Sequence, residues 1–141
     1  MPLPCELAVK SIVPAFRALV AKELVESYEL KQENIASLLG VTQSAVSQYT
    51  RSLRGKALDL DRVESVRMVA KDLAAALVRD SLSLKQMNQK YCEACRIARE
   101  TRIICVLHKR LGPSFNTDEC DACSPDCCFD SSNMRKSVRK R

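Results

Sequence analysis

Tryptophan is absent from this chain of 141 residues, and phenylalanine and tyrosine occur only three times each. Hydrophobic residues nevertheless make up 46% of the chain, so leucine, valine, isoleucine and alanine must fill the core. This composition predicts an all-α protein. No internal repeat is present in the sequence.

Several functional features are also missing. No apolar run approaches the roughly 20 residues that a membrane span needs, and Met1–Ser11 lacks the basic start and apolar centre of a signal peptide. We therefore expect a cytoplasmic protein with no membrane partner. There is no glycine-rich phosphate loop, and a single histidine cannot assemble the usual ligand set of a metal hydrolase. The sequence thus predicts no enzyme and no small-molecule substrate.

The amino-terminal part, residues 1–57, is predicted to hold three helices. Apolar residues recur at helical spacing from Pro14, which can open a helix, to about Tyr28. A second helix is predicted from Lys31 or Gln32 to Leu39, and Gly40 supplies the positive φ that ends it. The third begins after its cap, Thr42, and runs to about Leu53.

Residues 32–51, QENIASLLGVTQSAVSQYTR, have the pattern of a helix-turn-helix. Small Ala36 lets the two helices cross closely, Gly40 takes the turn, and Val41 and Val46 fill the wedge between the helices. The outer face is polar rather than rich in Glu and Lys, which favours base reading over an ordinary solvated face. The predicted DNA-binding residues are Thr42, Gln43, Ser44, Ser47, Gln48, Arg51, Arg54 and Lys56.

Residues 58–90 are predicted to form a helical linker and dimerisation segment. An apolar stripe at alternating three- and four-residue steps begins at Val63 and ends at Leu77. Such a stripe either docks on its own domain or pairs with a second subunit. Because regulators of this size usually read two half-sites as dimers, we expect a homodimer with this stripe as its contact. The same steps recur from Leu84 to Ala98, which predicts another helix.

Seven of the eight cysteines lie in residues 91–128, which we predict to be a small, irregular metal-binding module. Two cysteines separated by two residues bring two thiolates to one metal without long loop closure. Thiols stay reduced in the cytoplasm, so this spacing favours metal binding over disulfides. The predicted metal ligands are Cys92, Cys95, Cys105, Cys120 and Cys123.

The sequence leaves three interpretations of these cysteines open. A [4Fe-4S] cluster would use the first three with one of Cys120 or Cys123. Structural zinc would use the first three with His108, and a second zinc would bind the later cysteines together with Cys127 and Cys128. Thiols that sense by forming a disulfide are the third alternative, for which the adjacent Cys127 and Cys128 are poor partners. Cys5, far away in sequence, is expected to be a small buried hydrophobe.

The net charge of +6 lies at the two ends of the chain. Residues 1–57 carry +2, residues 58–128 are neutral, and residues 129–141 carry +4. We expect the last segment to be a flexible basic tail. A mildly basic helix-turn-helix and a basic tail suit a polyanionic partner such as double-stranded DNA.

The chain resembles a family of archaeal transcriptional regulators with an amino-terminal helix-turn-helix of the phage-repressor (XRE) type. The resemblance covers most of the chain and implies an operator-binding regulator. Pro4-Cys5-Glu6 contributes to the likeness, and this resemblance leaves room for Cys5 to complete a site across a dimer. Cys127-Cys128 and the basic tail depart from the family's usual ending. The other matching segments are Leu39–Tyr49, Cys92-x2-Cys95-Arg96, Ile104-Cys105, His108 and Cys120-Asp121-x-Cys123.

The sequence as a whole predicts a DNA-binding transcriptional regulator whose cysteines bind an iron-sulfur cluster that senses redox, oxygen or iron state. The first alternative is the same regulator with structural zinc. The second, an electron-transfer or cluster-scaffold protein, is opposed by the helix-turn-helix pattern.

Overall fold

The computed structural model describes residues 3–51, 58–111 and 116–120. All regular structure within these residues is helical, which confirms the predicted all-α class. The basic tail predicted at residues 129–141 lies outside the described residues.

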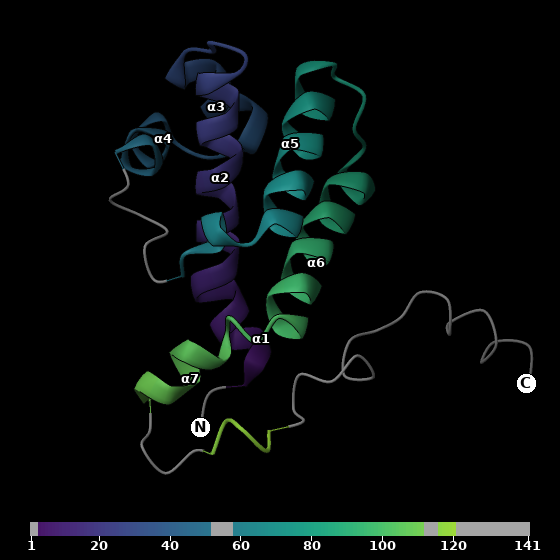
Figure 1. Ribbon diagram of the computed structural model, residues 1–141. Helices are drawn as coiled ribbons and strands as arrows, with labels where there is room; N and C mark the ends of the chain where they lie inside the picture. Colours follow the sequence, from purple (N-terminus) through teal and green to yellow (C-terminus); the bar gives the residue numbers. More distant parts are fainter. Residues whose placement is uncertain (1–2, 52–57, 112–115, 121–141) are drawn as a thin grey trace, which may run out of the picture.

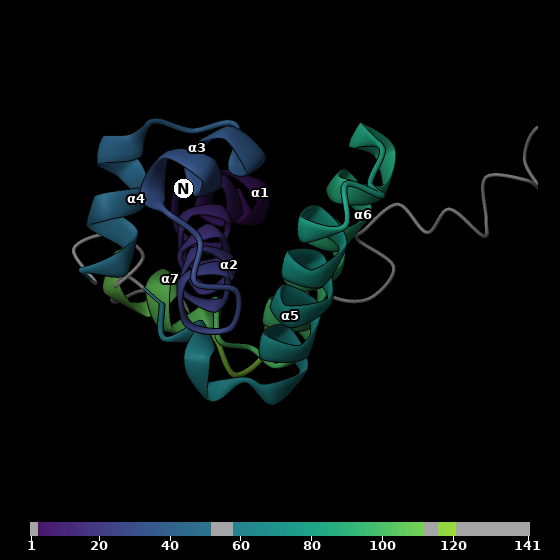
Figure 2. The same ribbon diagram turned by 90° about the horizontal axis from the view of Figure 1, so that it is seen from above.

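A long central helix organises the bundle. This helix, α2 (Val13–Glu26), packs against α3 (Gln32–Leu39) and α4 (Gln43–Thr50) on one side, and against α5 (Glu64–Val78) and α6 (Leu84–Glu100) on the other (Figure 1). The view from above shows the two helix pairs on opposite sides of α2 (Figure 2). Because α2 is covered on both sides, its buried residues include Phe16 and other large apolar side chains.

The helical structure begins earlier than Pro14. A single helical turn, α1 (Pro4–Leu7), is followed by a π-helical turn, η1 (Ala8–Ile12), in which the Val13 N–H donates to the Ala8 carbonyl. Pro14 lies in the first turn of α2, as predicted, but helical residues precede it. The wider π turn explains this, because a proline ring crowds the carbonyl four residues before it in a regular α-helix.

The turn between α3 and α4 follows the sequence prediction closely. Gly40 ends α3 with φ 65°, and the Val41 N–H donates to the Ala36 carbonyl at 3.0 Å. The Thr42 hydroxyl accepts a hydrogen bond from the Ala45 N–H at 3.1 Å and so caps α4. Helix α4 ends at Thr50, three residues before the predicted end at Leu53, which lies outside the described residues.

Replacement of Gly40 by alanine should destabilise the protein by about 1 to 2 kcal/mol, because an L-residue must adopt the left-handed conformation there. A Cβ at this position would meet nothing within 4 Å, so the cost comes from the backbone alone. Gly40→Asn should lose less, because asparagine tolerates this conformation. The free energy of urea unfolding measures both variants; equal values for alanine and asparagine would contradict the explanation.

The stripe proposed as a dimer contact is used inside the chain. Its four residues on α5 are between 0% and 7% exposed, Val63 just before the helix is half-buried, and α5 packs on α2 and α6. The expectation that this stripe forms the dimer contact is therefore wrong, and its other interpretation, docking on its own domain, is what the structure shows. The stripe residues are Val63, Val66, Ala70, Leu73 and Leu77.

Helix α6 covers the helix predicted from Leu84 to Ala98 and ends two residues later, at Glu100. It starts with a capping box in which Ser83 and Gln86 exchange hydrogen bonds with each other's backbone N–H. The domain boundary predicted between residues 90 and 91 falls inside this helix. Buried residues from Leu7 to Leu107 belong to one hydrophobic core, so the cysteine-bearing end of α6 is packed into the bundle.

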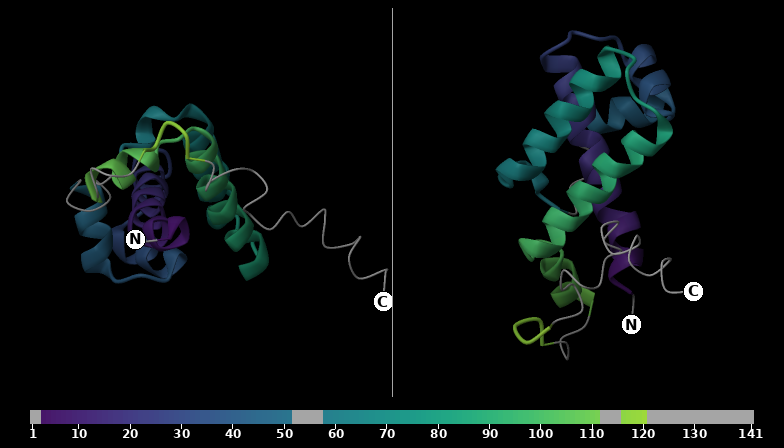
Figure 3. Two further views of the ribbon diagram at one scale, coloured as in Figure 1. Left: turned by 90° about the horizontal axis from the view of Figure 1, so that it is seen from below. Right: turned by 90° about the vertical axis from the view of Figure 1, so that its right-hand side faces the viewer.

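The end of the bundle near α1 receives the last described segments. Helix α7 (Cys105–Leu111) follows α6 after a short turn, and residues 116–120 lie at the same end in the right-hand view of Figure 3. Cys92 and Cys95 lie on α6, within the helix predicted from Leu84 to Ala98, and Cys105 is the first residue of α7.

Candidate functional site

The outer face of α4 presents the polar residues that the sequence singled out. Thr42, Gln43 and Ser44 are exposed at its amino-terminal end, and Arg51 is exposed at its other end. Ser47 and Gln48, in contrast, are half-buried. On the opposite side the buried residues are Ala45, Val46 and Tyr49, as predicted. Arg54 and Lys56, the other predicted contacts, lie outside the described residues.

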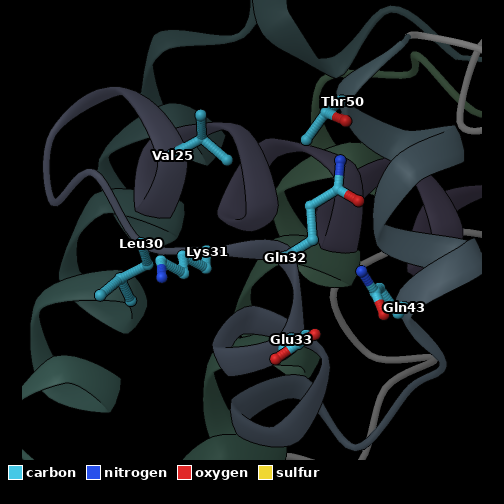
Figure 4. Close-up of a pocket in the computed structure, with 7 residues that line it drawn as sticks. All are labelled: Val25, Leu30, Lys31, Gln32, Glu33, Gln43 and Thr50. Atoms are coloured by element: carbon cyan, nitrogen blue, oxygen red, sulfur yellow. The ribbon is translucent and has the colours of Figure 1, made fainter.

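An open depression of about 500 Å³ adjoins this face (Figure 4). Gln32 from the first turn of α3 and Gln43 from the first turn of α4 both line it, with Thr50 at its edge. Partial positive charge gathers at the amino-terminal ends of both helices. Two amide side chains beside two helix starts make a surface rich in hydrogen-bond donors.

Gln32 and Lys31 were not among the sequence-predicted site residues. Lys31 directly precedes α3 and Gln32 is its first residue, and in the sequence these two residues indicated only where that helix starts. Only their place at the start of α3 could have pointed to the site. The first residue of α3 lies near the first residue of α4 when the two helices cross at a short turn. Exposed Lys31 is balanced by exposed Glu33, so the depression itself is not strongly basic.

The second group of candidate residues lies at the α1 end of the bundle. The Arg99 guanidinium on α6 donates to the Cys5 sulfur on α1 at 3.2 Å, a contact across 94 positions of sequence. The Arg102 guanidinium donates to the Cys120 carbonyl at 3.1 Å and ties residues 116–120 to the end of α6. Cys5 itself is exposed, so its expected role as a buried hydrophobe is wrong.

The described cysteines of the predicted ligand set differ in exposure. Cys92 is exposed, whereas Cys95, Cys105 and Cys120 are half-buried. Within residues 3–51, 58–111 and 116–120, no three His, Cys, Asp or Glu side chains are grouped closely enough to hold a metal ion. The thiolates of the predicted cysteine ligands suit zinc or an iron-sulfur cluster. The fifth predicted ligand, Cys123, lies outside the described residues, as do Cys127 and Cys128.

Polar side chains are buried near these cysteines. Arg99, His108 and Thr117 are 5%, 6% and 3% exposed, although they come from α6, α7 and the last described segment. His108, weighed as a surface residue or a zinc ligand, is thus a buried residue. Buried polar groups need partners, and the Arg99 guanidinium has one in the Cys5 sulfur.

No family model, curated protein or solved structure matches this chain. None of the described helices combines the length and the apolar character that crossing a bilayer requires. The residues of the two candidate sites therefore carry the functional argument.

Proposed function

We propose that the protein is a sequence-specific DNA-binding transcriptional regulator that places α4 in the major groove. The observation that carries this proposal is the division of α4 into two faces. Ala45, Val46 and Tyr49 are buried on one side, while Gln43 and Ser44 are exposed beside the capped amino-terminal end. Recognition helices of helix-turn-helix proteins contact base edges with residues of this end.

In this arrangement each exposed group contacts either a base edge or a phosphate. The Gln43 amide pairs with an adenine edge through two hydrogen bonds, and the Ser44 hydroxyl donates or accepts. Arg51 and the first turn of α3, with Gln32, contact phosphates and fix the register of the helix on the duplex. An α-helix with its side chains is about 10 to 12 Å across, which fits the roughly 12 Å width of the major groove.

A homodimer remains part of the proposal, because one helix of this length reads too few base pairs to be selective. The two α4 helices of a dimer would lie about 34 Å apart to reach successive major grooves. Since the α5 stripe is buried in its own chain, the contact between subunits must use other residues. The resemblance to archaeal regulators of the phage-repressor type supports the same function.

The proposal is tested by selecting bound duplexes from a random DNA pool with the full chain. We expect enrichment of one motif, present as two half-sites about 10 base pairs apart. The control is the same selected duplex with the half-sites scrambled. Binding of both duplexes with equal affinity at the same salt concentration would overturn sequence-specific recognition, because phosphate contacts alone do not distinguish them.

We further propose that Cys92, Cys95 and Cys105, with Cys120 or Cys123, take up a [4Fe-4S] cluster. Binding would have to bring these side chains together, because no three of the described ones are grouped to hold a metal in the structure. Such a cluster supplies oxidation-sensitive, one-electron chemistry to a thiolate site. Arg102, which donates to the Cys120 carbonyl, would bring positive charge beside a site of negative net charge. Structural zinc on the same cysteines is the alternative occupant.

Anaerobically purified protein should be brown and should contain iron and acid-labile sulfide, because thiolate-bound clusters absorb visible light. Cys95→Ser should lower the iron content sharply. Cys5→Ser is the matched variant outside the proposed ligand set, and it should leave the iron content unchanged. A colourless protein that contains stoichiometric zinc would overturn the cluster proposal and support the structural zinc site.

A further inference from the structure

A small cavity lies in the groove where α2 and α5 pack side by side (Figure 1). Its volume is about 130 Å³, and its lining comes from α2, α5 and the short helical turn η2 (Leu60–Arg62). The apolar part of the lining is half-buried Leu19 and Ala70, which is 2% exposed. The other lining residues all carry a charge: Lys22, Glu23, Glu26, Asp61, Arg67 and Lys71. The cavity is thus separate from the outer face of α4 and from the described cysteines.

The charges around this cavity are sorted between two walls. The wall on α5 is basic, because Arg67 and Lys71 are one helical turn apart and lie on the same side of that helix. The wall made by α2 and η2 is acidic, because it carries three carboxylates and a single ammonium group. The cavity therefore has no net charge as a whole, but its two walls have opposite signs.

The unlike charges face each other across the cavity without pairing. None of the six charged side chains forms an ion pair within the part of the chain that the structure describes. Glu23 accepts a hydrogen bond from the Ser27 hydroxyl at 2.6 Å, which does not neutralise its carboxylate. On the side of α5 that faces α6, in contrast, the Asp72 carboxylate pairs with the Lys90 ammonium group at 3.9 Å. Both walls of the cavity are thus open to a ligand that carries both charges.

We propose that this cavity binds a small free α-amino acid. The ligand's carboxylate pairs with Arg67 and Lys71, and its ammonium group donates to Glu26 and Asp61. A zwitterion is attracted by both walls, whereas a simple anion or cation is attracted by one wall and repelled by the other. Neither DNA recognition nor a metal is needed for this site.

The size of the cavity limits the side chain of the ligand. A volume of 130 Å³ is about four times the roughly 30 Å³ that a water molecule occupies in the liquid. This space suits glycine, alanine or serine, whose carbon atoms would contact Leu19 and Ala70. Glycine is the simplest probe, because it consists of little more than the two charged groups.

Glycine binding is measured by titrating the isotope-labelled full chain and following the amide signals of Leu19 and Ala70 at constant pH and ionic strength. Charges at a water-filled rim attract weakly, so we expect a dissociation constant on the order of 1 mM and saturation by about 50 mM. Two analogues each lack one charge, because glycinamide has no carboxylate and N-acetylglycine has no ammonium group. Each should bind at least about fivefold more weakly than glycine, since it loses the contacts of one wall.

Variants of the two walls test the same site from the side of the protein. Lys71→Gln and Glu26→Gln each remove one charge from an exposed side chain, so both should fold like the wild type. Each should weaken glycine binding by about two- to fivefold. Lys85→Gln is the matched control, because Lys85 is exposed on α6 and does not line the cavity. It should keep the wild-type affinity.

Saturable binding of glycine that both analogues and both wall variants weaken would establish the site. Lack of saturation with glycine, L-alanine and L-serine would overturn it. Binding of either analogue as tightly as glycine would also overturn it, because one wall would then be sufficient. Unchanged affinity in Lys71→Gln and Glu26→Gln, or an equal loss in Lys85→Gln, would show that glycine does not bind in this cavity.

Discussion

Replacement of Phe16 by alanine is expected to lower the free energy of unfolding by about 3 to 5 kcal/mol, the range for removing a large buried aromatic side chain. Phe16 is 0% exposed in the first turn of α2. The variant loses the transfer energy of the ring, leaves a cavity, and removes the edge-to-face contact with Tyr91. Since domains are stable by only about 5 to 15 kcal/mol, much of the stability would be lost.

Urea unfolding followed by circular dichroism measures this change, with the metal content of both proteins held equal because a bound metal adds its own stability. Tyr28→Ala is the matched control, because Tyr28 is also aromatic and is 37% exposed just after α2. It should change the free energy by less than about 0.5 kcal/mol. Similar losses in the two variants would show that Phe16 is not a core residue.

Replacement of Gln43 by alanine should weaken binding to the selected duplex by about 1 to 3 kcal/mol, the cost of losing one bidentate contact to a base. Gln43 is exposed at the first turn of α4, so its removal disturbs no buried contact. Affinity for the scrambled duplex should stay the same, because phosphate contacts carry nonspecific binding. The two affinities are compared by fluorescence anisotropy at one salt concentration.

The matched control is Gln89→Ala, which removes the same side chain from the exposed surface of α6. It should leave both affinities unchanged. If Gln43→Ala weakens binding to the selected and scrambled duplexes equally, Gln43 contributes to general DNA attachment and does not read a base.

The elements around α3 and α4 could be predicted because their signals are local. Gly40 adopts the positive φ that its position indicated, and the Thr42 hydroxyl caps α4. Ala45, Val46 and Tyr49 are buried because helical periodicity identifies the face of a helix that packs inward. Local residue chemistry was therefore sufficient for this part of the fold and for the outward position of Gln43.

The remaining features depend on contacts that periodicity does not encode. The stripe on α5 is apolar whether α2 or a second subunit covers it, so its pattern could not choose between them. The Arg99 contact with Cys5 joins residues 94 positions apart. Arg17 was one basic residue among many until the packing of α2 on α6 placed its guanidinium over the Tyr91 ring. Pairings at such distances follow from tertiary packing.

The π turn at Ala8–Ile12 also sets a rotational register for the start of the chain. It holds one more residue than an α-helical turn needs. Deleting one residue there would restore a regular helix and rotate every preceding residue by about 100° around the helix axis. Cys5 would then leave the side of the helix that meets Arg99. A one-residue insertion or deletion in this short segment therefore determines whether the Cys5 sulfur lies on the side of the bundle that carries the other described cysteines.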